Sequence, residues 1–200
     1  MTLRLRRDGR EFERAVEPRA ACRSEVGIAP GAEINAYANG SQVGIARGML
    51  NFVESDEELA FVVGHEIAHN VMDHVDITRG NMLIGSILGG LLDIAAASGG
   101  VYTGGAISSA GMEAGRRLKS VELEAEADYI GLYMLHNAGF DISGGADFWR
   151  RMGAEGGNLY ASTTHPTTPQ RFIAMRKTIA EIEAKAARGE PVLPTPADGR

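Results

Sequence analysis

The chain has only one cysteine, Cys22, among its 200 residues. One thiol cannot form an intrachain disulfide, so the fold does not depend on an oxidising compartment. An excess of basic residues is also missing: the net charge is −6, which argues against nucleic acid as a main partner. The first thirty residues lack the apolar stretch of a secretory signal. We therefore expect either that the protein is made without such a signal or that the chain begins after it.

Residues 80–112 have very little charge, with Asp93 as their only charged residue. Gly80 to Leu92 is too short to span a bilayer, and Ile94 to Met112 is diluted by glycine, serine and threonine. A membrane helix centred near Asp93 would bear a cost of about 2.5–3.5 kcal/mol for that carboxylate. We therefore predict a loosely structured, glycine-rich apolar insertion, such as a helix pair or a lid near the cleft. A peripheral membrane contact through residues 80–112 stays open.

Size and composition suit one domain, because 200 residues with 44% apolar content can bury a sizeable core. We expect a single domain over residues 1–200, with its motifs at 33–175 and a flexible, proline-rich tail at 190–200. Residues 1–30 are mixed in charge, and we expect them to form a strand or helix packed on the edge of the domain.

The most informative stretch is His65-Glu66-Ile67-Ala68-His69. Apolar residues at helical spacing predict one helix from a cap at Ser55 to about Asp76. On a helix, His65 and His69 lie one turn apart on one face, where both imidazoles can bind one Zn²⁺ ion. Glu66 can flank the metal and take a proton from the water that the metal activates. The alternative is a pair of surface histidines on an amphipathic helix.

A catalytic zinc needs three protein ligands and an open position, so a third ligand has to come from elsewhere. His74 is turned well away from His69 on the expected helix, and we expect it to support the site or to lie on the surface. Glu124 and Asp128 share one face of a second helix, expected at 112–137. Glu124 can supply the third ligand, and Asp128 can accept the other ring N–H of a liganding histidine. The alternative for any such acidic run is a solvated helix face.

Two other segments complete the pattern. Asn39-Gly40 between residues 33–38 and 41–46 predicts a β-hairpin, whose edge can pair with an extended peptide or simply cover the core. Near the end, His165-Pro166 precedes a helix expected from Pro169 to about Arg188. By spacing alone, a loop histidine in this place is more often structural than catalytic.

Together these stretches resemble the zinc metallopeptidase family that includes the HtpX heat-shock protease, the mitochondrial Oma-type protease and the CaaX prenyl protease. The motifs that match occur in the family's order: Ile34-Asn35-Ala36-Tyr37-Ala38, Asp56-Glu57-Glu58-Leu59-Ala60, Gly64-His65-Glu66-Ile67-Ala68-His69, Glu124-Ala125-Glu126-Ala127-Asp128 with Gly131, and Ser162-Thr163-Thr164-His165-Pro166 with Arg171. This combination is far more specific than the first histidine motif alone.

The resemblance implies an α+β, mostly helical fold, with a zincin-like metallopeptidase core and a small β-sheet whose edge strand lines the cleft. It also implies a role for each matching residue. His65, His69 and Glu124 would bind one Zn²⁺ ion per chain, with Glu66 as general base. Asp128 would support a ligand, and His165, with Arg171 in support, would stabilise the oxyanion. The expected substrate-binding residues are Asn35, Ala36 and Tyr37.

The function implied is a zinc-dependent endopeptidase of protein quality control, which cleaves unfolded or membrane-associated proteins with Glu66 as general base. The resemblance favours a bacterial-type cell envelope or a membrane-associated location over the cytoplasm. The alternative is a non-catalytic, metal-stabilised module that grips peptides as a chaperone does. Such a module would have no use for Glu66 beside an open metal position. The sequence does not predict an oligomeric state.

Overall fold

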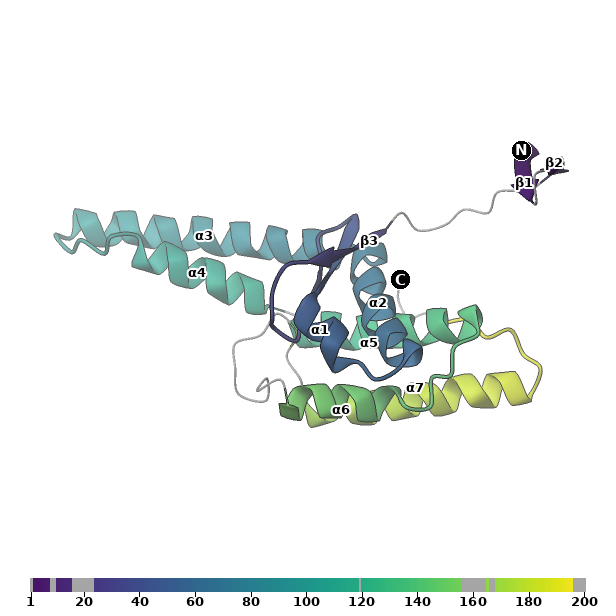
Figure 1. The fold of residues 1–200 in the computed structure, drawn as a ribbon. Helices are drawn as coiled ribbons and strands as arrows, with labels where there is room; N and C mark the ends of the chain where they lie inside the picture. Colours follow the sequence, from purple (N-terminus) through teal and green to yellow (C-terminus); the bar gives the residue numbers. More distant parts are fainter. Residues whose placement is uncertain are drawn as a thin grey trace.

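The computed structural model describes residues 2–7, 10–15, 24–118, 120–155, 165 and 168–195. The strands are β1 (Thr2–Arg7), β2 (Arg10–Ala15), β3 (Glu25–Ala29), β4 (Ala36–Ala38) and β5 (Gln42–Ala46). The helices are α1 (Arg47–Phe52), α2 (Asp56–Val71), α3 (His74–Ser98), α4 (Ala106–Arg117), α5 (Ser120–Ala138), α6 (Gly145–Glu155) and α7 (Pro169–Ala187). The fold is therefore α+β and mostly helical, as expected (Figure 1).

The core lies where α5 packs between α2 and α7, with α6 against α7 (Figure 1). Each helix contributes apolar side chains at helical spacing, as an amphipathic helix does when one face is buried. The cluster includes Val62 from α2, Tyr133 from α5, Phe148 from α6, and Met175 and Ile182 from α7. This packing places α2 and α5, which carry the histidine and acidic motifs, against each other.

The helices α2 and α5 approach each other closely where Gly64 faces Gly131. A Cβ atom on Gly131 would lie 3.3 Å from the backbone C and O atoms of Gly64. Larger side chains at this crossing would push the helices apart, because protein interiors have little free space. The two glycines therefore let the histidines of α2 reach the carboxylates of α5.

A three-stranded sheet in the order β3-β5-β4 lies beside α2, with β3 parallel and β4 antiparallel to β5. The hairpin expected at Asn39-Gly40 is confirmed, and β4 forms one edge of the sheet. Asn70, near the end of α2, fastens this hairpin to the helix. Its Oδ1 accepts from the backbone N–H of Gly40 at 2.7 Å, and its Nδ2 donates to the carbonyl of Gln42 at 3.2 Å.

Two expected helices are each broken in two. The segment 55–76 stops at Val71, Asp73 takes the left-handed conformation with φ of 55°, and α3 begins at His74. The segment 112–137 is interrupted at Leu118, whose backbone is extended. Neither break carries a proline, so helical spacing alone runs through both. The breaks redirect the chain so that α3 and α4 project from the core (Figure 1).

The insertion at 80–112 is more regular than expected. It belongs to α3 and α4, which pack against each other as a helix pair. The helix pair was one of the two forms predicted, whereas a loosely structured segment was wrong. The pair extends away from the core (Figure 1).

The two ends of the chain also differ from expectation. At the start, β1 and β2 pair with each other and stand apart from the core, while β3 forms an edge of the sheet (Figure 1). At the other end, residues 190–195 are held by hydrogen bonds rather than free. Asn137 Nδ2 donates to the carbonyl of Val192 and Lys185 Nζ to that of Leu193, each at 2.9 Å. Cys22, Ser162-Thr163-Thr164, Pro166 and residues 196–200 lie outside the described residues.

Candidate metal and active site

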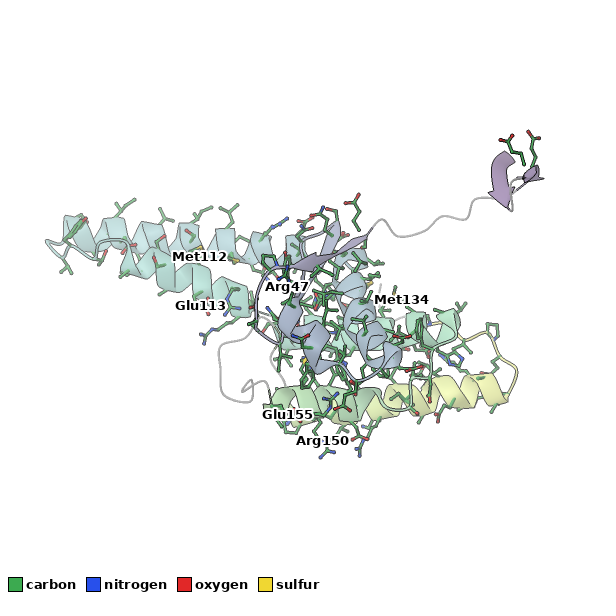
Figure 2. All side chains as sticks on the ribbon, in the orientation of Figure 1. Arg47, Met112, Glu113, Met134, Arg150 and Glu155 are labelled. Carbon is green, nitrogen blue, oxygen red and sulfur yellow. The ribbon has the colours of Figure 1, made fainter. Side chains whose placement is uncertain are left out.

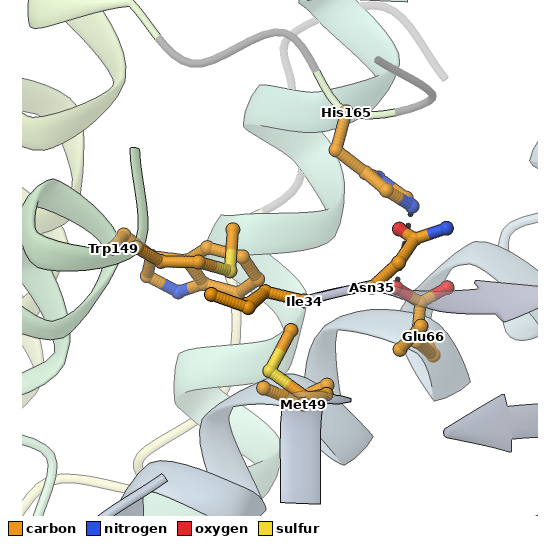
Figure 3. Close-up of a pocket in the computed structure, with 9 residues that line it drawn as sticks. Ile34, Asn35, Met49, Glu66, Trp149 and His165 are labelled. Atoms are coloured by element: carbon orange, nitrogen blue, oxygen red, sulfur yellow. Dashed lines mark ion pairs between the residues drawn. The ribbon is translucent and has the colours of Figure 1, made fainter. Parts of the chain in front are cut away.

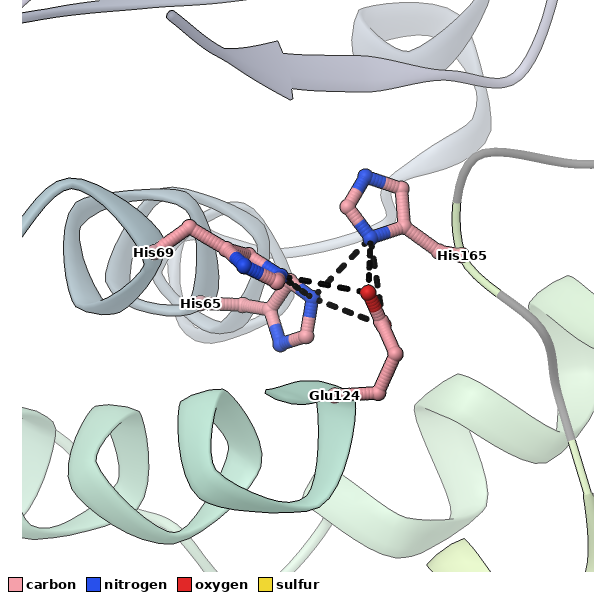
Figure 4. Close-up of side chains that lie close together, drawn as sticks. All are labelled: His65, His69, Glu124 and His165. Atoms are coloured by element: carbon pink, nitrogen blue, oxygen red, sulfur yellow. Dashed lines mark hydrogen bonds and ion pairs between the residues drawn. The ribbon is translucent and has the colours of Figure 1, made fainter. Parts of the chain in front are cut away.

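Four side chains from separate parts of the chain meet at one point (Figure 4). His65 and His69 come from α2, Glu124 comes from α5, and His165 precedes α7. Their donor atoms all lie within 4.8 Å of one another. Nε2 of His65 lies 3.1 Å from Nε2 of His69, and each lies 3.3 Å from an oxygen of Glu124. The structure therefore brings together the three residues that the sequence predicted as metal ligands.

The donor spacing suits a metal ion. In a tetrahedral site with bonds of about 2.0–2.1 Å, neighbouring donor atoms lie about 3.4 Å apart. The separations of 3.1 to 3.3 Å among the two histidines and Glu124 are close to this value. Imidazole nitrogens combined with a carboxylate oxygen are a donor set that divalent transition metals favour. The residues present therefore fit a metal ion.

His165 lies within the same cluster. Its Nδ1 is 2.9 Å from Oε1 of Glu124 and 3.3 Å from Nε2 of His65, while its Nε2 is 3.4 Å from Oε1 of Glu66. We expected this histidine beside the substrate, as a donor to the oxyanion. The ring lies in the donor cluster and also lines the pocket described below, so the role beside the substrate stays a prediction.

Asp128 and Arg171 form a buried pair behind the donors. Arg171 donates from Nε and Nη2 to the two carboxylate oxygens of Asp128 at 2.8 and 2.7 Å, a bidentate arrangement. The same guanidinium places Nη1 3.0 Å from Oε2 of Glu124. Oδ1 of Asp128 in turn lies 3.0 Å from Nδ1 of His65. Both residues are thus near the predicted ligands, and Arg171 contacts the acidic groups rather than the pocket described below.

His74 supports His69 from the opposite side. The Nδ1 atoms of the two rings lie 3.0 Å apart, and Nε2 of His74 lies 3.3 Å from Oε2 of Glu126. His74 is fully buried, because the break at Asp73 turns it inward. Of the two places expected for His74, support of the site is therefore the one observed.

Burial and charge act against each other on these groups. Desolvation alone would lower the pKa of His65, but hydrogen bonds with Asp128 and Glu124 raise that pKa to about 10. Burial alone would raise the pKa of Glu124, yet His165 and the other two histidines hold it well below its usual range. For His69, desolvation prevails and lowers the pKa. Without a metal ion, the positive charge balancing these carboxylates includes a proton on His65.

An apolar pocket opens beside the donors (Figure 3), with a volume of about 290 Å³ that includes its open mouth. Its lining residues are Ile34, Asn35, Ala36, Met49, Val62, Glu66, Trp149, Met152 and His165. Two of the three predicted substrate-binding residues, Asn35 and Ala36, are among them. Tyr37 is not, because its ring covers Gly44 on the neighbouring strand.

Glu66 connects this pocket to the donor cluster. The side chain is buried, and its Oε2 has no hydrogen-bond partner among the described residues. Burying a carboxylate oxygen without a partner is costly, so such an atom marks a place where a ligand, an ion or water completes the site.

Sequence reasoning missed the apolar residues of the pocket. Met49, Trp149 and Met152 follow ordinary helical spacing, and nothing in that spacing separates them from the core. Trp149 also contacts the site directly, with its ring centroid 4.9 Å from that of His65 and the Arg171 guanidinium 5.4 Å from it. The only available signal was that Trp149 is the single tryptophan of the chain.

Two histidines one turn apart, a glutamate from a second helix, and an acidic neighbour facing a pocket together define a class of protein. This arrangement is that of the zincin-type metallopeptidases. The profile of Peptidase family M48 matches residues 8–179, and the chain belongs to that family. The resemblance inferred from the motifs is therefore confirmed.

Curated relatives agree with this assignment. The chain is 30% identical to the mitochondrial metalloendopeptidase OMA1 of Schizosaccharomyces pombe, over 73% of this chain and 43% of the relative. It is 32% identical to the protein of the same name from Arabidopsis thaliana, over 69% and 28%. It is 33% identical to a putative beta-barrel assembly-enhancing protease of Vibrio cholerae, over 72% and 32%. The chain thus spans less than half the length of these relatives.

Proposed function

We propose that the chain is a zinc-dependent endopeptidase that hydrolyses peptide bonds of unfolded or membrane-associated proteins. The observation that carries this proposal is the position of Glu66. Its Oε2 is buried without a hydrogen-bond partner among the described residues, at a pocket that adjoins the donor cluster. A general base has to lie within reach of the water it deprotonates and of the bond to be cleaved.

In this proposal, His65, His69 and Glu124 hold the zinc ion. When bound, zinc would polarise the scissile carbonyl group and make water a stronger acid. Glu66 takes the proton of the attacking water at Oε2 and delivers it to the leaving amine, a role worth about 10²–10⁴-fold in rate. Asp128 keeps the ring of His65 in one orientation, and Arg171 keeps Asp128 charged.

His165 takes part in two arrangements in this proposal. A catalytic site needs one open position among its ligands, and the ring of His165 fills that corner of the donor set. The ring therefore swings out when substrate enters, and its N–H then donates to the oxyanion that the carbonyl oxygen becomes when water adds to the carbonyl carbon. Removing one such donor costs about 10²–10³ in turnover.

The pocket and the sheet edge favour an extended, apolar substrate. The edge strand β4 offers backbone groups to a peptide, and Asn35 and Ala36 lie just before and at its start. The apolar lining of the pocket, which includes Met49 and Trp149, favours an apolar substrate side chain at its mouth. Unfolded segments present such side chains on extended backbone, which supports unfolded proteins as substrates.

Three variants test the mechanism. Glu66→Gln keeps the shape of the side chain but removes the base, so we expect bound zinc near the wild-type level and peptide cleavage lowered about 10²–10⁴-fold. His69→Ala and Glu124→Ala each remove a ligand, so we expect loss of zinc itself. Bound zinc is measured by elemental analysis and cleavage with casein or a quenched fluorescent peptide. Cleavage by Glu66→Gln at the wild-type rate would refute the mechanism.

The same variants separate the rival function, a metal-stabilised module that binds peptides without cleaving them. That module predicts equal peptide binding with or without Glu66 and no product from the unsubstituted chain.

His165→Ala tests the proposed role of His165 as a donor to the oxyanion: we expect turnover to fall about 10²–10³-fold. A rise in turnover would mean that the ring only blocks the site.

A further inference from the structure

The hairpin formed by α3 and α4 turns its large apolar side chains outward. Within the described residues, α3 is the one helix long and apolar enough to cross a membrane, and almost none of it is buried. Its large side chains that are more than half exposed are Leu83, Ile84, Ile87, Leu88, Leu91, Leu92 and Ile94. Figure 2 shows green carbon sticks that project from α3 into open space. This surface is far larger than the scattered apolar residues found on most soluble proteins.

The inner face of the hairpin has the opposite character, because small residues form the contact between the helices. A Cβ atom on Gly85 would lie 2.0 Å from the carbonyl oxygen of Gly111, and one on Gly115 would lie 2.2 Å from that of Asn81. Ser86 and Ser108 place their hydroxyl groups 3.2 Å apart across the same contact. A water-soluble helix pair buries its leucines and isoleucines between the helices. Helices packed in lipid have small residues at the contact between them and large apolar residues on their outer surface, as in this hairpin.

The single acidic group of the insertion is hydrogen-bonded within the hairpin. The carboxylate of Asp93 accepts hydrogen bonds from the backbone N–H groups of Ser108 at 2.8 Å and Ile107 at 3.2 Å, and from the hydroxyl of Thr103. It thereby caps the first turn of α4, where a negative charge is favourable. The hydrogen-bond donors belong to the same hairpin as the carboxylate, so they would stay bonded to it in an apolar medium. This lowers the free-energy cost of placing the carboxylate there.

Charge returns only at the base of the hairpin. Arg79 lies near the start of α3 and pairs with Asp76, while Arg116 and Arg117 at the end of α4 both pair with Glu113, which leaves a net positive charge among these five residues. From Arg79 to its end at Ser98, α3 is about 28 Å long at about 1.5 Å per residue. This length is close to the roughly 30 Å of a hydrocarbon core. Tyr102, almost fully exposed in the tip, is a residue type enriched at membrane interfaces.

We propose that the α3–α4 hairpin inserts tip-first into a lipid bilayer, with Arg79, Arg116 and Arg117 among anionic headgroups. Large apolar side chains point outward from Leu83 to Ile94 while small residues form the contact between the helices, and this combination favours lipid over a groove on a protein partner. The base of the hairpin reaches the candidate site, since α3 begins at His74 and Arg79 Nη2 donates to the carbonyl of Asn39 at 3.2 Å. Insertion therefore holds the pocket and the edge of β4 near the membrane surface.

Vesicle flotation tests this proposal independently of catalysis, because the chain used carries Glu66→Gln. We expect it to float with vesicles of phosphatidylcholine and phosphatidylglycerol. The double variant Ile87→Asp with Leu91→Asp should lower the bound fraction at least about tenfold, because an aspartate is strongly unfavourable in a bilayer core. Both positions are exposed, so the variant should remain folded and metal-binding. The matched control is Ile173→Asp on α7, whose side chain is equally exposed at 56%, and we expect it to float normally.

A fluorescent label distinguishes insertion from surface attachment. In a chain with Cys22→Ser and Leu88→Cys, an NBD group at position 88 should shift to shorter wavelength on vesicles and be quenched by lipids with spin labels deep in their acyl chains. Wild-type flotation without this quenching would overturn the proposal. So would flotation of the double aspartate variant, or light scattering that shows a dimer lost in that variant, since a second copy would then be the partner.

Discussion

Arg171 is the residue that allows two carboxylates to be buried side by side. Its guanidinium contacts both oxygens of Asp128 and one of Glu124, and all three side chains are buried. Burial by itself would raise the pKa of Asp128, but the charge of Arg171 lowers it. The two carboxylates thus stay ionised at neutral pH.

Arg171→Ala should therefore destabilise the protein by about 3–5 kcal/mol, because it leaves buried charges without their partner. Bound metal should also decrease, since Glu124 and Asp128 would gain protons more easily. Urea denaturation and elemental analysis measure both effects. The control is Arg176→Ala on the same helix, whose ion pair with Asp147 is exposed and should contribute only about 0–1 kcal/mol. Equal effects of the two substitutions would contradict the role given to Arg171.

His65 leads to a second prediction, on proton release. Its pKa is raised to about 10 by Asp128 and Glu124 in the metal-free protein, so the ring carries a proton at pH 7. A metal ion binds only the neutral ring. Zinc binding at pH 7 should therefore release a proton, and the apparent affinity should rise with pH up to about 10. Calorimetry in buffers of different ionisation enthalpy counts the protons, and binding without release would contradict this assignment.

At the scale of elements, the site depends on how closely α2 and α5 cross. Helix propensity alone would disfavour glycine within a helix by about 0.5–1 kcal/mol relative to alanine. Gly131 nevertheless occupies the crossing, where it lies against the backbone of Gly64. Because Gly131 has no side chain, it permits the short distance between the histidines of α2 and Glu124 of α5.

Gly131→Leu should separate the two helices. We expect a loss of about 1–3 kcal/mol from overpacking, and weaker zinc binding because the proposed ligands come from both helices. The control is Gly80→Ala in the exposed part of α3, where an added Cβ meets nothing within 4 Å. That change should be neutral or stabilise the helix by about 0.5–1 kcal/mol. Normal zinc affinity in Gly131→Leu would show that the crossing is adjustable.

At the scale of the whole molecule, the structure divides into a packed core and a projecting hairpin (Figure 1). The hairpin helices pack mainly against each other, and the metal donors all belong to the core. The core should therefore fold without the hairpin, since stability follows from buried apolar contacts.

A chain with residues 82–113 replaced by two glycines should test this division. Asn81 and Gly115 are already in contact, so the junction needs little rearrangement. We expect zinc binding to persist and Tm to change by no more than about 4 °C, equivalent to roughly 1 kcal/mol at this size. Circular dichroism and elemental analysis are the measurements. An unfolded or metal-free product would show that the hairpin is part of the core.

Local patterns allowed most helices and the ligand set to be predicted. His65 and His69 are four residues apart on one helix, so their shared face follows from the geometry of the helix, with Glu66 one position round from it. Thr168 and Pro169 likewise predicted the start of α7, and the structure confirms the side-chain cap from Thr168 to the N–H of Arg171. The breaks at Asp73 and Leu118 were not predicted, because neither position carries a proline or glycine that would end a helix.

The sequence by itself determined which side chains can bind a metal and on which helices they lie, since both follow from residue type and helical period. Only the tertiary structure decided that Glu124 reaches the histidines, that His165 joins them, and that Arg171 neutralises the carboxylates. It also decided that the leucines of α3 face outward. Helical period states which residues share a face, but the packing of the other helices decides whether that face meets protein, water or lipid.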